Sequence, residues 1–158
     1  MDAQRRILMK GMGAGSVLTA LAAAGLLKPS RVFAAEEWRS AAFAAKDIDG
    51  ALKGLGANNP AESRDIVLTV PEIAENGAMV PVSVVSNIPD TVSIAVLSQK
   101  NPMPLSAIFE FANGALPEAQ IRMRLAETTL VKAVVKTADG KFYTARKEVK
   151  VTVGGCGA

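Results

Sequence analysis

The first amphipathic pattern in the chain has the period of a helix. Its apolar positions follow one another at spacings of four, three, four and three residues: Ala41, Ala45, Ile48, Leu52 and Leu55. Residues spaced in this way share one face of an α-helix. Glu36 and Glu37 suit the N-terminal end of the helix dipole, and Gly54 and Gly56 mark the C-terminal end. The pattern therefore predicts one helix over residues 36–55, packed by its alanine-rich face on the rest of the domain.

Beyond residue 60 the pattern changes to the alternation and β-branched residues that are typical of strands. Seven runs have this character: 65–70, 79–85, 91–97, 107–111, 120–125, 130–137 and 141–153. Ala138-Asp139-Gly140 is a hairpin signal between the last two runs, and Pro81 favours an edge position or a bulge. Asn76-Gly77 and Asn113-Gly114 are predicted as turns. Short strands separated by turn signals predict an immunoglobulin-like antiparallel β-sandwich, here over residues 35–153.

An uncharged run, residues 11–27, follows a short basic N-terminus. This order, with the small residue Ala34 ahead of the expected cleavage point, is typical of an export signal. The run is 17 residues long and rich in glycine and alanine, whereas a membrane-spanning helix needs ~20 apolar residues. We therefore expect residues 1–34 to be removed, and the mature chain to begin at Ala35 without inserting into a membrane. An uncleaved membrane anchor is the alternative.

The basic N-terminus resembles a bacterial twin-arginine export signal. The segment 4–10 keeps the arginine pair, Arg5 and Arg6, and a lysine four residues after it. It departs from that pattern at Gln4, where Ser or Thr is usual, and at Leu8, where Phe is usual. The twin-arginine route exports folded proteins, so we expect this chain in the periplasm. The ordinary secretory route is the alternative, because paired arginines also occur in its signals.

Removal of the signal changes the charge of the protein. Residues 1–34 hold one acidic side chain, Asp2, and five basic ones: Arg5, Arg6, Lys10, Lys28 and Arg31. Of the 18 basic and 15 acidic residues in the whole chain, 13 and 14 therefore remain, which gives the mature chain a net charge of −1. A domain so balanced lacks the basic surface by which proteins bind nucleic acid, and we expect no nucleic-acid partner.

The chain ends Gly154-Gly155-Cys156-Gly157-Ala158, and Cys156 is its only cysteine. Glycine has no side chain to pack and a permissive backbone, so we expect residues 154–158 to form a flexible arm with a thiol near its tip. The last predicted strand ends at Val153, three residues before Cys156. At full extension the sulfur can therefore lie roughly 10 Å beyond the strand.

The composition excludes several classes of enzyme. The chain has no histidine, so the Ser-His-Asp triad, Cys-His activation and the usual zinc and iron sites cannot form. One cysteine cannot hold an iron–sulfur cluster. Carboxylates at Glu72, Glu75, Asp90, Glu110 and Glu118 show no catalytic or ligand spacing. We therefore expect neither a cofactor nor a self-sufficient enzyme.

Three functions remain for a lone thiol on a glycine arm in an exported domain. In the first, Cys156 carries a covalent passenger and partner enzymes act on it. A thiol with the reference pKa of ~8.5 is mostly protonated at neutral pH, so its reactivity would be turned on in the partner's pocket. In the second, the chain is an interaction subunit and Cys156 forms only an interchain disulfide. The third, a redox-active thiol, needs a resolving cysteine from another protein.

Four segments resemble the SoxY family, the Y subunits of the bacterial thiosulfate-oxidation carrier. They are the terminal Val149–Gly157 segment together with Pro71–Gly77, Lys100–Pro102 and Ile121–Arg124. The resemblance covers essentially the whole mature chain. It departs from the family at Ala158, where the terminal motif ordinarily ends in glycine.

This resemblance implies a function for the terminal thiol. Cys156 would hold thiosulfate-derived sulfur, and Gly154, Gly155 and Gly157 would let the arm enter narrow active sites. A SoxZ-like β-sandwich subunit is the implied heterodimer partner. A c-type cytochrome would load thiosulfate, a hydrolase would release sulfate, and in many organisms a dehydrogenase would oxidise the remaining sulfane sulfur.

Overall fold

The computed structural model of this protein describes residues 40–153. The predicted signal peptide with Arg5 and Arg6 lies outside the described residues, and so does the start of the predicted helix. The predicted arm, with Gly154, Gly155, Cys156 and Gly157, lies outside them as well. Among the described residues, no helix is long and apolar enough to cross a membrane.

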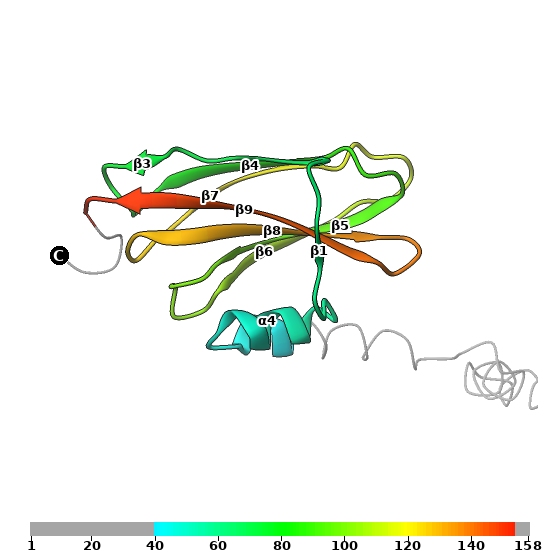
Figure 1. The fold of residues 1–158 in the computed structure, drawn as a ribbon, viewed down its shortest axis with the longest axis horizontal. Coiled ribbons are helices and arrows are strands. Elements are labelled where there is room, and N and C mark those ends of the chain that lie inside the picture. The colour runs from blue at the N-terminus through cyan, green and yellow to red at the C-terminus, as the bar shows by residue number, and fades with distance from the viewer. Residues whose placement is uncertain (1–39, 154–158) are drawn as a thin grey trace, which may run out of the picture. The chain divides into compact units, whose positions relative to one another are not determined.

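The described part of the chain is mainly β and forms two sheets (Figure 1). The larger sheet has the strand order β1-β9-β8-β5-β6, with β3 also paired to β9, and the smaller sheet has the order β2-β4-β7. The strands are β1 (Ala61–Glu62), β2 (Ile66–Thr69), β3 (Ile73–Ala74), β4 (Val80–Ser86), β5 (Thr91–Ser98), β6 (Leu105–Glu110), β7 (Glu118–Met123), β8 (Thr129–Thr137) and β9 (Phe142–Val151). All seven runs predicted from the alternation are strands.

The main core fills the space between the two sheets, because alternate residues of each strand point into it. In β4 these residues are Val80, Val82 and Val84, and β5 contributes Ile94 and Val96 from the facing sheet. All five side chains are almost fully buried. The two sheets therefore form a β-sandwich around one apolar layer.

A second core lies on the outer face of the larger sheet, where α4 (Ile48–Gly54) packs (Figure 1). Leu52 from α4 joins Ala95 and Leu97, which lie on the face of β5 opposite Ile94. The strand is therefore buried on both faces. This explains why residues 91–97 carry few polar side chains although the strand belongs to an antiparallel sheet.

The prediction of one helix over residues 36–55 is wrong within the described residues. Residues 40–44 are helical, the chain then leaves the helix, and α4 begins at Ile48. Asp47 causes the break, because its backbone is extended and its Oδ1 accepts a hydrogen bond of 2.6 Å from the N–H of Gly50. An aspartate in this role starts a new helix instead of continuing an old one.

The strands also depart from a purely antiparallel arrangement. Two short strands that the sequence did not predict, β1 and β3, pair parallel to β9 near its start and its end. Pro81 lies in β4, the central strand of the smaller sheet. The pairing of β4 with β2 ends at Ser83, which pairs with Thr69, so Pro81 has no partner in β2. The proline therefore has a strand on one side only, and the predicted edge position is correct locally.

The predicted turns match the backbone. Asn113 and Gly114 both have positive φ, and Gly140 has φ 84° in the hairpin between β8 and β9. The carboxylate of Asp139 in that hairpin accepts hydrogen bonds from Lys141 and Thr137, which lower its pKa to about 2. This stabilisation is present above the ordinary pKa of an aspartate and is lost as the pH falls towards 2.

Candidate functional site

The candidate site is the end of β9, because the glycine arm follows it directly. On one side β9 is bonded to the short strand β3. The N–H of Lys150 donates to the carbonyl of Glu72 at 2.9 Å, and the N–H of Thr152 donates to that of Ala74 at 3.1 Å. The hydroxyl of Thr152 also donates to the carbonyl of Glu75 at 2.8 Å. This side of the strand is therefore bonded as far as Thr152.

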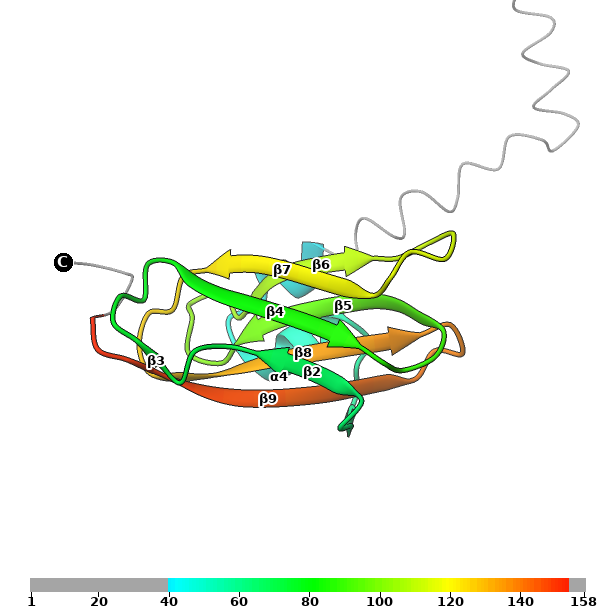
Figure 2. The ribbon, with the colours of Figure 1, turned by 90° about the horizontal axis from the view of Figure 1, so that it is seen from above.

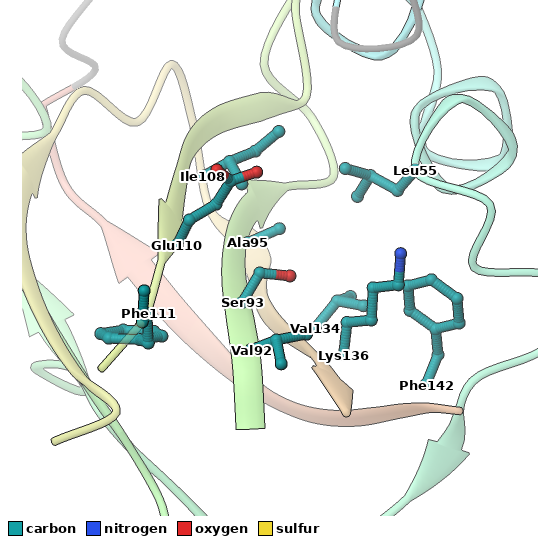
Figure 3. Close-up of a pocket in the computed structure, with 11 residues that line it drawn as sticks. Leu55, Val92, Ser93, Ala95, Ile108, Glu110, Phe111, Val134, Lys136 and Phe142 are labelled. Atoms are coloured by element: carbon teal, nitrogen blue, oxygen red, sulfur yellow. The ribbon is translucent and has the colours of Figure 1, made fainter. Parts of the chain in front are cut away.

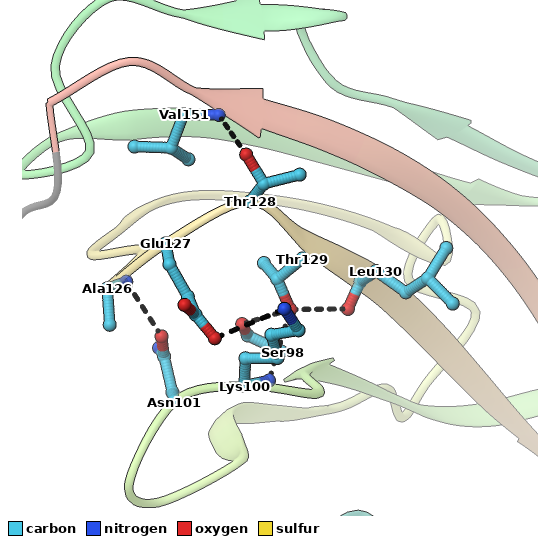
Figure 4. A network of polar contacts seen from close by, with 9 residues as sticks. All are labelled: Ser98, Lys100, Asn101, Ala126, Glu127, Thr128, Thr129, Leu130 and Val151. Carbon is cyan, nitrogen blue, oxygen red and sulfur yellow. Dashed lines mark hydrogen bonds and ion pairs between the residues drawn. The ribbon is translucent and has the colours of Figure 1, made fainter.

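On its other side β9 is bonded to β8, whose first residue, Thr129, pairs with Val149. Thr128, the residue before β8, continues this hydrogen bonding with its side chain. Its Oγ1 accepts a hydrogen bond of 3.0 Å from the N–H of Val151 (Figure 4). A threonine side chain thus extends the hydrogen bonding of β9 beyond the point where β8 begins.

The last described residue, Val153, is held by the turn that follows β3. Its carbonyl accepts a hydrogen bond of 2.8 Å from the N–H of Gly77, and the carbonyl of Gly77 accepts one of 2.7 Å from Leu125. Asn76 shapes this turn, because its Oδ1 accepts a hydrogen bond from the N–H of Ala78. The predicted turn at Asn76-Gly77 therefore connects the base of the arm to the end of β7.

The turn between β5 and β6 joins the same network (Figure 4). Asn101 donates from its Nδ2 to the carbonyl of Arg124 at 2.7 Å and accepts at its Oδ1 from the N–H of Ala126 at 3.1 Å. Lys100 pairs with Glu127 at 3.2 Å. The side chain of Asn101 thus bonds one backbone carbonyl and one backbone N–H of the loop between β7 and Thr128.

The four segments that carried the resemblance therefore meet at one end of the sandwich (Figure 2). Residues 71–77 bond to the end of β9, residues 121–124 lead to the partner of Gly77, and residues 100–102 hold the loop behind them. They come from distant parts of the sequence, yet together they fix the backbone as far as Val153. The four segments therefore form a hydrogen-bonded base at the point where the predicted arm begins.

The site residues predicted from the sequence, Gly154, Gly155, Cys156 and Gly157, follow this base directly but lie outside the described residues. The side chains that hold the base were not predicted. Thr128, Thr152 and Asn101 act through backbone groups far away in the sequence. Asn101 and Thr152 each belong to one of the four segments that carried the resemblance, whereas Thr128 belongs to none of them.

The described residues also include a pocket of about 330 Å³ at the opposite end of the larger sheet (Figure 3). Apolar side chains line most of it, and Lys136 lies over the ring of Phe142 with its Nζ 5.6 Å from the ring centre. Phe142 and Val151 are the two ends of β9, about 30 Å apart at ~3.3 Å per residue. This separation exceeds the reach of roughly 10 Å beyond Val153 that the sequence predicts for Cys156, so the pocket is not part of the candidate site.

Among residues 40–153, no three His, Cys, Asp or Glu side chains lie close enough together to hold a metal ion. The five carboxylates singled out in the sequence are not gathered at one place. Glu72 and Glu75 contribute backbone carbonyls to the base of the arm. Glu110 lines the distant pocket.

Comparisons with known proteins agree with this arrangement. The family described as "Sulfur oxidation protein SoxY" matches residues 52–156. The sulfur carrier protein SoxY from Chlorobium limicola f thiosulfatophilum is 40% identical, with a TM-score of 0.61, over 68% of this chain and 97% of that one. A variant of the superoxide reductase neelaredoxin from Ignicoccus hospitalis is 20% identical, with a TM-score of 0.50, over 58% of this chain and 82% of that one, which shows a similar fold only. No curated protein matches the chain.

Proposed function

Since the chain belongs to the SoxY family of sulfur oxidation proteins, we propose that it is a carrier that holds sulfur intermediates covalently on Cys156. The observation that carries the proposal is the extent of the family match, which ends at Cys156 itself. The protein of known structure with 40% identity is called a sulfur carrier protein. In this proposal the chain carries out no catalysis alone, and partner enzymes act on the cargo.

The base of the arm supports this function physically. A carrier must hold its domain still while its thiol moves between active sites. The backbone is bonded through Val153, and glycine follows at positions 154 and 155. The change from a bonded strand to residues without side chains is therefore abrupt, which favours a flexible arm that starts at Gly154.

The chemistry proposed for Cys156 is a cycle of bond formation and hydrolysis. A c-type cytochrome removes two electrons as the thiol sulfur bonds to the sulfane sulfur of thiosulfate, and the thiol proton is released. A hydrolase then adds water, releases sulfate and leaves a persulfide on Cys156. A dehydrogenase that oxidises this sulfane sulfur completes the set of partners where it is present.

We extend the proposal to the location and assembly of the protein. Residues 1–34 direct export by the twin-arginine route, and the mature chain from Ala35 works in the periplasm. Its sandwich, residues 35–153, is immunoglobulin-like and pairs with a SoxZ-like β-sandwich subunit. Residues 154–158 remain outside that pairing so that the thiol is available to enzymes.

Replacement of Cys156 by Ser tests the proposal. We expect Cys156→Ser to abolish the formation of reducible sulfur and sulfonate adducts, as measured by intact mass after incubation with thiosulfate and the loading cytochrome. The free energy of unfolding should stay within about 0.5 kcal/mol of the wild type, because the residue lies beyond the bonded strand.

Two results would contradict the carrier function. Adducts that persist in Cys156→Ser would place the cargo elsewhere. A wild-type protein that forms only a disulfide-linked dimer, and no adduct, would favour the interaction subunit.

A further inference from the structure

The end of the sandwich from which the arm leaves exposes four large apolar side chains. They are Ile73 (59% exposed), Met79 (67%), Met103 (56%) and Val153 (58%). We call them the arm-end surface. Single exposed apolar residues are ordinary on a protein, but a group gathered at one functional point marks a contact surface.

The topology places these four residues at the same end. Met79 stands directly before β4, whose first residue pairs with the last residue of β7. Met103 lies in the turn between β5 and β6, which is bonded to the loop after β7. Ile73 pairs with Lys150 near the end of β9. In Figure 2, β3, the start of β4 and the ends of β7 and β9 all lie at the left.

Other exposed apolar residues of the described chain lie elsewhere. Leu116, at 81% exposure, precedes β7 at the opposite end, where the next residue, Pro117, bonds to the end of β4. It therefore offers a matched control, since it is at least as exposed as Met79 but is separated from the arm by the length of the sandwich.

The length of the arm identifies what must cover the arm-end surface. Cys156 is the third residue after Val153, so it extends roughly 10 Å at most from the last bonded residue. An enzyme that draws the sulfur into its active site must bring the entrance of that site within this distance of Val153. The enzyme's surface around the entrance then meets the side chains that surround the base of the arm.

We propose that the arm-end surface is the docking surface for the enzymes that act on Cys156, and that its occupant is an apolar rim around their active-site entrance. This proposal rests on the carrier function. Two of the four residues are methionines, whose unbranched, polarizable side chains adapt to differently shaped partners. The nearby charges of Lys100 and Glu127 pair with each other at 3.2 Å, so neither is left as an unpaired charge that would oppose apolar contact.

Charge substitutions test the proposal in the mature protein together with its companion subunit. Met79→Asp and Met103→Asp should each raise the KM of the loading cytochrome for the carrier about tenfold, with kcat unchanged. Leu116→Asp should leave both constants as in the wild type. A small maleimide should alkylate Cys156 at the same rate in all variants, because a small reagent needs no docking surface.

Several results would overturn the proposal. An unchanged KM in Met79→Asp and Met103→Asp would do so, and so would an equal rise in Leu116→Asp. Loss of the one-to-one complex in light scattering would instead assign the surface to the companion subunit. A wild-type carrier that is alkylated by maleimide but never loaded with thiosulfate would refute the carrier function itself, which is a different result from an altered KM.

Discussion

At the scale of single residues, Thr128 extends the hydrogen bonding of β9 beyond the start of β8. The side chain stands one residue before β8 begins and offers its Oγ1 to the N–H of Val151. Without it, β9 would lose its bond on that side two residues before the chain reaches Val153. Thr128 therefore positions the end of β9, and in the proposed function it would act on the arm through this strand and not on the cargo.

We predict that Thr128→Val loosens the base of the arm. Valine keeps the shape and the preference for strands but removes the acceptor, at a cost of about 1 kcal/mol. Amide hydrogen exchange at Val151 should accelerate about fivefold, and a nitroxide label on Cys156 should become more mobile. Thr69→Val is the control, because Thr69 is exposed on β2 and its hydroxyl has no hydrogen-bond partner among the described residues. Equal exchange at Val151 in both variants would contradict this role.

The sequence singles out the residues of the predicted arm, which lie outside the described residues, but not the side chains that hold its base. Cys156 stands out because it is unique and lies among glycines. Thr128 and Thr152 resemble any threonine near the end of a strand. Their roles depend on partners that lie 23 and 77 positions away in the sequence, a separation that no local pattern reports.

At the scale of elements, the two helical pieces are joined by a very close contact. A Cβ atom at Gly54 would lie 2.6 Å from the Cα of Ala42 and 2.8 Å from its backbone nitrogen. Ala42 is fully buried. Glycine is therefore required at position 54 because residues 40–44 approach α4 too closely for a side chain. Its position at the end of α4 is a separate reason for glycine there.

We predict that Gly54→Ala destabilises the domain although alanine favours helices. The added methyl must displace backbone, which costs about 1–3 kcal/mol and outweighs a gain of about 1 kcal/mol in helix propensity. Urea unfolding measures the change. Gly50→Ala is the matched control, because the nearest atom to its new Cβ is a side-chain oxygen at 3.2 Å, and we expect it to be neutral or stabilising. If Gly54→Ala were as stable as Gly50→Ala, the close contact would not exist in solution.

The sequence predicts long elements well and short ones poorly, for a physical reason. The seven predicted strands are long enough to show alternation or a β-branched run, and each has at least one face in a core. β1 and β3 have two residues each, which is too short for any period. The break before α4 was missed because Ala45 and Ile48 continue the apolar face across it, while the signal for a new start rests on Asp47 alone.

At the scale of the whole molecule, the two sheets leave strands without a neighbour on one side. Within the described residues, β6 is an edge of the larger sheet, and β2 and β7 are the edges of the smaller one. Unpaired edges favour association with another β-rich chain. Residues 35–158 together carry a net charge of only −1, which does not oppose such an association.

We predict that the mature chain forms a one-to-one complex with the proposed SoxZ-like subunit. Co-expression should raise the yield of soluble protein, and light scattering should give the mass of one copy of each chain. The complex should form equally with Cys156→Ser, because the partner meets the sandwich and not the thiol. A stable monomer that ignores the subunit, or a complex that needs Cys156, would count against this assembly.

The pairing of β9 has a mechanical consequence. In the proposed carrier function an enzyme draws Cys156 inward, and we expect tension to pass along the chain into the end of β9. The strand β9 is hydrogen-bonded to β3 on one side and to β8 and Thr128 on the other. These hydrogen bonds lie across the direction of the pull. They are therefore loaded together in shear and are not broken one after another. In that function we therefore expect the sandwich to act as a fixed anchor while Gly154 and Gly155 take up the strain of each delivery.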